Sequence, residues 1–436
     1  MNSKTITPWL PAKASMREMI DALWKLPRDI VSDGYDLALE ALSTQLSVEI
    51  HEYPTGTECW TWTVPEKWTC HEAYLETING ERLFSYEDNP LHVMSYSLPF
   101  EGEISKGELL SHLHVNQRLP EAIPYRYAFY ERDWGLCCTK SMRDSLVDDR
   151  YRVVIRTAFD KGTMKIGEIT AQGQTDETII ISAHLDHPAM VNDDLSGVAV
   201  GIGVMRELLR MDNLRYTYKF LILPETIGSV AYLHSNEHSL DKIKGGLFLE
   251  MLGLDNPPAL QESFVSNSEL DSCFKLAMNE FDPASWTGPF RSIVVNDERQ
   301  FNGPGLRIPM LSLSRALPRT NPDWPYLEYH SSFDCPGILS DDALAQSKSL
   351  ILSMVKTLET NRVPVNEFKG EVFLSRYNMH IDLHDDPQGH KDLFGIMYLI
   401  DGEHSVAQIA EKCEVSFEKV LKIVCELDQH GLVSYK

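Results

Sequence analysis

Two histidines and three aspartates lie close together in the segment SAHLDHPAMVNDDLSG, residues 182–197. His184 and Asp186 come directly after an apolar run, and Asp193 and Asp194 stand just before a Ser-Gly pair that we expect to open a helix. Imidazole nitrogens and carboxylate oxygens are ligands that Zn²⁺ accepts, so one strand–loop–helix unit can deliver both to a single metal ion. Asp186 is placed to accept the second ring N–H of His184 and fix the tautomer of that ligand.

Three further segments place ligand groups after apolar runs. The run KFLIL (219–223) is followed by Glu225, GLFLE (246–250) ends in Glu250, and the loop after MLSLS (310–314) carries His330 and Asp334. Each residue alone is explained as a solvated carboxylate or a hydrogen-bonded structural histidine. Ligands gather beyond the carboxyl ends of parallel strands, however, so two histidines and several carboxylates at four successive strand ends favour a metal site.

Two arginines near these strand ends are candidates for binding a substrate carboxylate. Arg299 in DERQF and Arg315 in SLSR can each offer a bidentate pair of donors. The alternative is an ion pair with a neighbour such as Asp297 or Glu298. The adjacent cysteines 137–138 raise the question of thiol catalysis, but no histidine in a recognisable nucleophile motif lies beside them, so we expect buried structural residues.

The apolar runs also predict the sheet that positions these residues. Strands buried on both faces show as nearly continuous apolar runs, and TIIIS (178–182) supplies the strand before His184. A helical stretch at 197–210 separates the first two runs, and such alternation indicates a parallel sheet. We therefore predict an α/β domain, formed by residues 1–47 and 151–362, with a mostly parallel sheet and helices on both faces. Its first helix begins with a capping box, Ser15 with Glu18.

Residues 48–150 differ in texture from this α/β domain. They are rich in aromatic residues, prolines and short alternating runs such as WTWTV (60–64), HVMSYSL (92–98) and YRYAFYE (125–131). Turn signals separate these runs, so the sequence predicts an inserted β-rich domain.

Residues 365–436 predict a third domain. Helices at 391–400, 405–412 and 416–430 and a strand at 431–435 follow the order of a winged helix. The domain holds 13 Asp or Glu residues against 7 Lys or Arg residues, whereas a reader of DNA needs a basic footprint. We expect protein contact or dimerisation rather than DNA binding.

The composition of the chain argues against nucleic acids and membranes as partners. The chain has 436 residues and a formal net charge of −24, which should repel nucleic acids and anionic membranes. Its eight cysteines form no C-x-x-C pair and are expected to be reduced thiols. The N-terminus lacks an apolar signal core, and no run is long enough to cross a membrane. We expect a soluble, cytoplasmic protein.

The motifs together resemble a known family. The order H-x-D, D-D-x-S-G, a glutamate after a strand, L-E-M-x-G and Y-H is similar to that of the M28-type zinc metallo-aminopeptidases. The segments PETIGS (224–229), DERQFNGPG (297–305), YHSSFD (329–334) and PEAIPYRYAFYERDWGLC (120–137) resemble a bacterial aminopeptidase-like group. That group joins a zinc exopeptidase-like domain, an inserted β-rich domain and a C-terminal winged helix, and the resemblance spans nearly the whole chain.

This resemblance implies a metal site with assigned roles. His184 and Glu250 would hold one zinc ion, His330 and Glu225 would hold the other, and Asp193 would bridge the two. It also implies a cis peptide bond after Asp193.

Two departures from the family pattern leave roles open. The family usually has two adjacent glutamates where this chain has Pro224-Glu225, so either the general base or one metal ligand is missing. The ligand role for Glu225 is slightly favoured, because the proline fills the preceding position; Asp194 or Glu298 would then have to act as the base. Asp186 and Glu225 are the catalytic candidates. Glu250, moreover, stands where many relatives have aspartate.

The resemblance predicts a hydrolase that carries one or two Zn²⁺ ions and cleaves an amide bond of a small peptide or aminoacylated metabolite. Tyr329 joins Arg299 and Arg315 as a candidate substrate-binding residue. One alternative is an amidase, deacylase or acyl-cyclising enzyme of the same metal class. Another is a binding or scaffold protein with weakened catalysis, which the single glutamate after KFLIL supports. We expect a small-molecule substrate, with neither nucleic acid nor membrane as a partner, and homo-oligomerisation stays open.

Overall fold

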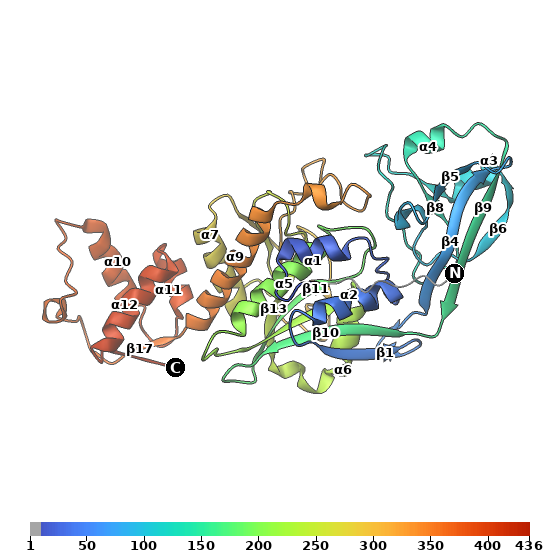
Figure 1. Ribbon diagram of the computed structural model, residues 1–436. Helices are drawn as coiled ribbons and strands as arrows, with labels where there is room; N and C mark the ends of the chain where they lie inside the picture. The colour runs from blue at the N-terminus through green and yellow to red at the C-terminus, as the bar shows by residue number, and fades with distance from the viewer. Residues whose placement is uncertain (1–9) are drawn as a thin grey trace. The chain divides into compact units, whose positions relative to one another are not determined.

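The computed structural model describes residues 10–436, which form two compact units (Figure 1). The first unit contains the described residues up to Phe264 together with Gly288–Lys348, and the second contains Val265–Thr287 and Ser349–Lys436. Residues 1–9, where the sequence predicted no signal segment, lie outside the described residues. None of the helices formed by residues 10–436 is long and apolar enough to cross a membrane.

An eight-stranded sheet forms the centre of the first unit. Its four middle strands are parallel and lie in the order β12 (Thr217–Leu223), β11 (Thr178–His184), β13 (Ile243–Leu249) and β16 (Met310–Ser314). The outer strands are β10 (Thr163–Ala171) and β1 (Glu49–Pro54) on one side, and β14 (Ala259–Gln261) and β15 (Trp286–Gly288) on the other. The predicted α/β fold with a mostly parallel sheet is confirmed, because the four apolar runs form the four parallel strands.

Helices cover both faces of this sheet, which explains why its middle strands are apolar throughout. On one face, Ile180, Leu221 and Phe248 pack with residues of α6 in one hydrophobic cluster. The other face receives α5, where a Cβ on Gly201 would come within 2.1 Å of the ring of Phe220. A glycine is therefore needed for the helix to lie this close to the sheet. Outside the β-rich region, the α-helices of this unit are α1 (Met16–Leu23), α2 (Asp33–Ser43), α5 (Leu195–Leu208), α6 (Ile227–Ser235), α8 (Glu298–Phe301) and the first part of α9 (Asp341–Thr360).

The N-terminal helices begin where the sequence predicted. Ser15 caps α1 by accepting from the backbone N–H of Glu18, whose side chain accepts from Ser15 in return, so the capping box is present. The helix then packs against α5 (Figure 1).

The inserted β-rich region is built on a four-stranded antiparallel sheet. Its strands lie in the order β5 (Arg82–Ser85), β4 (Lys67–Thr77), β9 (Arg150–Asp160) and β6 (Phe100–Ser105). The remaining elements of the region are β2 (Glu58–Cys59), β3 (Trp62–Thr63), β7 (Leu113–His114), β8 (Leu136–Cys137), α3 (Lys106–His112), α4 (Lys140–Asp144) and the 3₁₀ turn Pro90–His92.

Strand positions within this region differ from the prediction. The runs at 92–98 and 125–131 contain only isolated bridges, such as the one between Ser95 and Tyr127, instead of regular strands. The expected boundaries at 48 and 150 also shift, because β1 pairs with β10 in the large sheet and β9 continues to Asp160 in the small one. Alternation of residue types cannot say which sheet a strand joins.

The second unit combines two separate stretches of the chain. It contains α7 (Glu269–Phe281), the end of α9, α10 (Pro387–Tyr398), α11 (Val406–Cys413), α12 (Phe417–Gln429) and the hairpin of β17 (Pro364–Asn366) with β18 (Val433–Tyr435). The three predicted helices and the last strand are present within a few residues of their expected bounds. Whether they constitute a winged helix stays a prediction.

The cysteines are free thiols. Cys137 and Cys138 are completely buried, and burial raises the pKa of Cys138 to about 12. A thiol with so high a pKa is not a nucleophile at neutral pH, so the structural interpretation of this pair is confirmed.

Candidate metal centre

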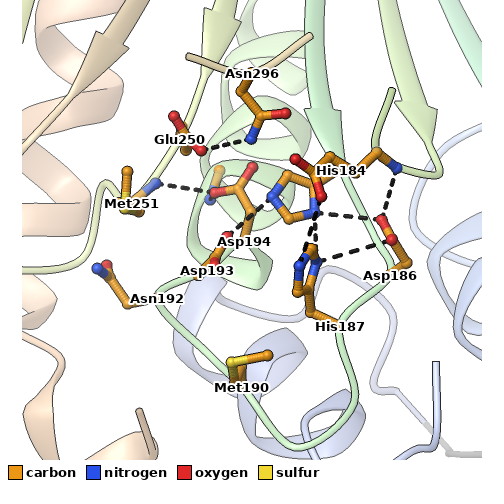
Figure 2. A network of polar contacts seen from close by, with 12 residues as sticks. His184, Asp186, His187, Met190, Asn192, Asp193, Asp194, Glu250, Met251 and Asn296 are labelled. Atoms are coloured by element: carbon orange, nitrogen blue, oxygen red, sulfur yellow. Dashed lines mark hydrogen bonds and ion pairs between the residues drawn. The ribbon is translucent and has the colours of Figure 1, made fainter. Parts of the chain in front are cut away.

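Polar side chains from several loops converge at the carboxyl ends of the parallel strands (Figure 2). His184 is the last residue of β11, Glu225 follows β12 by two residues, and Glu250 follows β13 directly. His330 lies in the loop after β16, and its ring reaches Asp193. These side chains therefore lie at the carboxyl-end edge of the sheet, where the apolar runs predicted them.

His184 lies between two aspartates, and all three side chains are buried. Its Nε2 is 3.0 Å from Oδ1 of Asp193, and its Nδ1 is 3.3 Å from Oδ1 of Asp186. Burial disfavours a charged ring, but the two carboxylates outweigh burial and raise the pKa of His184 well above its ordinary value. Burial likewise disfavours charge on Asp193, yet the neighbouring histidines hold its pKa well below the ordinary value.

His187 completes this cluster, and sequence reasoning did not single it out. Its Nδ1 is 3.2 Å from Nδ1 of His184, and its Nε2 is 3.6 Å from Oε2 of Glu225. Burial lowers the pKa of His187 to about 4, so the ring is neutral at pH 7, which is the state that binds metals. The spacing H-x-D-H after a buried strand was the available signal, since it gives one loop two imidazoles.

Two overlapping sets of ligand atoms result. The ligand atoms of His184, His187 and Asp193 all lie within 4.8 Å of one another, and so do those of Asp186, His187 and Glu225. His187 belongs to both sets. Asp193 offers its two oxygens to different loops, because Oδ1 faces His184 while Oδ2 lies 3.1 Å from Nε2 of His330.

The carboxylates of the site fit a bound cation. Asp186 Oδ2, Asp194 Oδ2 and Glu250 Oε2 are buried oxygens that receive no hydrogen bond from any described residue. Burial raises the pKa of Asp194 and Glu250 well above their ordinary values, and it raises the pKa of Glu225 to about 8. Buried acidic oxygens without donors are costly unless a cation balances them. The donor set of imidazoles and carboxylates is therefore suited to a divalent metal ion.

The peptide bond between Asp193 and Asp194 is cis, as the family resemblance implied. Asp194 accepts from the backbone N–H groups of Gly197 and Met251 at 3.0 and 3.1 Å, which ties the start of α5 to the segment after β13. Its second oxygen stays without a donor, as described above.

A buried arginine holds the loop that carries His187. Arg28 is fully buried and donates through Nε to the carbonyl of Leu185 at 2.8 Å. Its Nη2 donates to the carbonyls of His187 and Met190 at 2.6 and 3.1 Å. Hydrogen bonds to the groups around a metal ligand fix the orientation of that ligand. Nothing local in the sequence around Arg28 indicated this role.

A buried aspartate holds the other half of the same loop. Asp334 accepts from the backbone N–H groups of Val191, Asn192 and Asp193 at 3.3, 2.8 and 3.1 Å. Tyr326 donates its hydroxyl to the same carboxylate at 2.6 Å. The loop with His330 thus also shapes the loop with Asp193.

The two alternative bases differ in their surroundings. Glu298 is buried, accepts from Gln261 Nε2 at 2.9 Å and from the backbone of Asn296 at 3.0 Å, and has a pKa that burial raises to about 7. Asp194, by contrast, keeps one carboxylate oxygen without a donor. Glu250 also keeps one, while its other oxygen accepts from Asn296 Nδ2.

The three predicted substrate-binding residues lie in different settings. Arg299 donates to Thr226 Oγ1 at 2.7 Å, next to Glu225, and Tyr329 stacks on His330 with ring centroids 3.9 Å apart. Arg315 is buried, and its guanidinium donates to Ser347 Oγ, to the carbonyl of Asn256 and to Gln346 Oε1. These bonds engage the guanidinium inside the fold, so the structure does not support a role for Arg315 in substrate binding. Its acceptors lie in segments that the sequence could not connect to it.

Comparison with known proteins gives this chain a family. A family described as a domain of unknown function, DUF4910, matches residues 17–361. A protein of Clostridium acetobutylicum with the provisional name polysaccharide biosynthesis protein with aminopeptidase-like domain is 31% identical over 406 residues, which are 92% of each chain. A crystal structure of a provisionally named peptidase from that organism has a TM-score of 0.86 at 29% identity and covers 97% of this chain and 96% of its own.

A more distant likeness identifies the fold. BSAP, a zinc aminopeptidase from Bacillus subtilis, has a TM-score of 0.57 at 13% identity and covers 78% of this chain and 94% of its own. This similarity confirms the expected aminopeptidase-like architecture. The family match extends over most of the chain and the relative in C. acetobutylicum covers nearly all of it, so the chain belongs to the DUF4910 family.

Proposed function

We propose that this protein is a zinc-dependent hydrolase that cleaves an amide bond of a small peptide or an aminoacylated metabolite. The convergence of His184, His187 and Asp193 within 4.8 Å, at the ligand-binding edge of an aminopeptidase-like fold, carries the proposal. These residues would hold one zinc ion. Asp186 and Glu225, together with His187, offer a second set of donors, and His330 reaches Asp193 from the opposite loop.

The residues around the ligand set suit this reaction. Zinc, when bound, supplies a Lewis acid that polarises the amide carbonyl and a lowered pKa for a reacting water. The pKa of Glu225, which burial raises to about 8, suits a group that exchanges protons near neutral pH. Arg299 lies beside this glutamate through Thr226 and can receive a substrate carboxylate. Tyr329 covers one face of His330 and would border the substrate.

The name of a relative suggests one class of substrate. The name of the C. acetobutylicum relative refers to polysaccharide biosynthesis, so an aminoacylated sugar belongs among the substrates to be tested. We propose a cytoplasmic enzyme whose partner is this small molecule rather than a nucleic acid or a membrane. The acidic C-terminal region would then serve in protein contact.

Two alternative functions keep specific support. An amidase or deacylase of the same metal class would use the same donor set on N-acyl substrates. A binding protein with weakened catalysis is favoured by one observation, namely that the loop after β12 offers a single carboxylate, Glu225, where two are usual in aminopeptidases of this type.

Metal analysis combined with turnover tests the proposal. We expect one or two zinc ions per chain, and activity on an aminoacyl amide that chelation removes and zinc restores. Turnover of N-acyl substrates alone would favour the amidase, and a metal-free, inactive protein would contradict the proposal.

The variant Glu225→Gln separates the two roles of this residue. Loss of zinc would identify a ligand, whereas full zinc with kcat lowered by roughly 10²–10⁴ would identify a general base. Full zinc and unchanged turnover would remove Glu225 from the mechanism. Glu52→Gln, an exposed glutamate on β1, serves as the matched control.

Duplex DNA binding by the full-length chain tests the expected absence of a nucleic-acid partner. Salt-sensitive, submicromolar binding would contradict it.

A further inference from the structure

We propose that Tyr125, a residue of the inserted β-rich region, is a positioning residue for the two histidines His187 and His330. The inference rests on the proposed metal-dependent function, and it assigns part of the metal site to a region outside the α/β sheet. Tyr125 is 5% exposed, and it belongs to the segment between β7 and β8.

Main-chain hydrogen bonds join this segment to the loop that carries His330. The backbone N–H of Tyr125 donates to the carbonyl of His330 at 2.8 Å. The backbone N–H of Ser332 donates to the carbonyl of Ile123, also at 2.8 Å, and Ile123 N–H donates to Ser332 Oγ at 3.0 Å. Together with the antiparallel bridge between Pro124 and Ser331, these bonds form a short two-stranded connection.

The ring of Tyr125 lies against both histidines. Its centroid is 4.9 Å from that of His187 and 5.3 Å from that of His330, with interplanar angles of 62° and 83°. The two imidazoles are themselves 5.2 Å apart. Edge-to-face contacts favour particular ring orientations, so one tyrosine restrains two imidazoles that reach the site from different loops.

The backbone at both histidines needs such support. His330 has φ of 52° and His187 has φ of 80°, both in the left-handed region that non-glycine residues avoid. Such conformations persist only when surrounding contacts hold them, and they cluster at functional sites. At His330, the bond from Tyr125 N–H fixes the carbonyl directly.

Apolar packing also joins the β-rich region to the loop that carries His187. Ile123 and Tyr125 share a buried cluster with Cys137 of the β-rich region and with Ala189 and Met190 of the His187 loop. The β-rich region therefore packs against both ligand loops at once. Its insertion completes the site, and metal affinity should depend on it.

Zinc affinity, measured by competition with a chromophoric chelator, tests this proposal on the full-length chain. We expect Tyr125→Leu, which keeps an apolar side chain but loses the ring, to weaken zinc binding by about 10- to 100-fold, the usual effect of losing a residue that supports metal ligands. The absorption spectrum of the Co²⁺-substituted protein should change as well, because the ligand geometry relaxes. Tyr125→Phe should bind zinc as the wild type does, since the contacts described use the ring and the backbone.

Controls separate positioning from stability. Tyr130→Leu removes a half-exposed tyrosine of the same region, whose hydroxyl donates to the Thr63 carbonyl, and should leave zinc affinity and the Co²⁺ spectrum unchanged. A wild-type protein that binds no metal would defeat the proposed function. A metal-binding wild type whose affinity survives in folded Tyr125→Leu, or falls equally in Tyr125→Phe, would overturn the role of the ring.

A second variant covers the case in which Tyr125→Leu does not fold. Ser332→Ala removes the acceptor of the Ile123 N–H while retaining the ring. We expect about a threefold to tenfold loss of zinc affinity, equivalent to one hydrogen bond. Unchanged affinity in this variant would overturn the proposed connection.

Discussion

Two of the loops that supply ligand groups to the candidate site are held in different ways. The inner loop, residues 184–194, is buried along its whole length, whereas the outer loop, residues 326–334, contains buried, partly buried and exposed positions. Charged groups hold the inner loop: the guanidinium of Arg28 binds its carbonyls and the carboxylate of Asp334 binds its N–H groups. Main-chain hydrogen bonds with Tyr125 and Ile123 of the inserted region hold the outer loop.

This difference predicts that the inner loop is rigid and that the outer loop can move. A desolvated charge with several partners is costly to disturb, so the inner loop should be fixed as part of folding. Main-chain bonds between neutral groups open at lower cost than the contacts of a buried charge, so the partly exposed outer loop should be able to adapt when metal or substrate binds. Asp334 links the two, because it belongs to the outer loop and receives the N–H groups of the inner one.

The largest effect is expected for Arg28→Met. The change replaces the guanidinium by an apolar side chain of similar length and leaves the carbonyls of Leu185, His187 and Met190 without this donor. We expect the free energy of unfolding to fall by about 3–5 kcal/mol, as when one partner of a buried charged network is removed. Chemical denaturation measures this loss, and Arg210→Met, at an exposed arginine just after α5, should change the free energy of unfolding little. A loss below about 1 kcal/mol would show that charge does not hold the inner loop.

A somewhat smaller effect is expected for Asp334→Ala. Three backbone N–H groups of the inner loop and the hydroxyl of Tyr326 lose their acceptor. We expect a loss of about 2–3 kcal/mol, the penalty for buried donors left unsatisfied. Asp176→Ala, at an exposed aspartate, is the control. If denaturation curves of the two variants coincide, the proposed coupling of the loops is wrong.

The dependence of zinc affinity on pH contrasts His187 with Glu225. Burial lowers the pKa of His187 to about 4, so this ligand releases no proton on binding above pH 5. Burial raises the pKa of Glu225 to about 8, so below pH 8 this carboxyl must lose a proton before it can bind metal. Its contribution makes zinc affinity rise about tenfold per pH unit between pH 6 and 8 and level off above pH 8. In Glu225→Gln the slope should fall by one proton, and an unchanged slope would exclude Glu225 as a ligand.

The smallest effect is expected for Arg118→Ala at the outer loop. Arg118 is partly exposed and donates to the carbonyls of Trp324, Tyr326 and Leu327 at 3.2–3.3 Å. We expect a stability loss of less than about 1 kcal/mol, with faster amide exchange confined to residues 324–330. Exchange that also accelerates in residues 184–194 would contradict the separation of the two loops.

Sequence patterns predicted where the ligand residues lie better than they predicted the contacts that hold the two loops. Apolar runs at the parallel strands placed His184 and Glu225 at the correct edge, because the strand ends of a parallel sheet must converge. The contacts of Arg28 and Tyr125 join residues far apart in the chain, and no local pattern encodes such pairs. His187 could have been found from its spacing alone.

The regions without a parallel sheet were harder to predict for a related reason. The long strands β4 and β9 pair across more than seventy residues, whereas the alternating runs at 92–98 and 125–131 form no regular strand. Periodicity reports that a segment is half-buried, and it cannot report its partner.

The division of the second unit into two stretches of chain has a consequence for how this protein can be shortened. The DUF4910 match ends at Asn361, whose side chain donates to Glu269 at the start of α7 and accepts from Ala407 at the start of α11. A stop codon after residue 361 would remove α10, α11 and α12 but leave α7, which would lose its contact with α11. Such a fragment should expose apolar surface of α7 and aggregate, so a shortened protein that stays soluble should lack α7 as well as the C-terminal region.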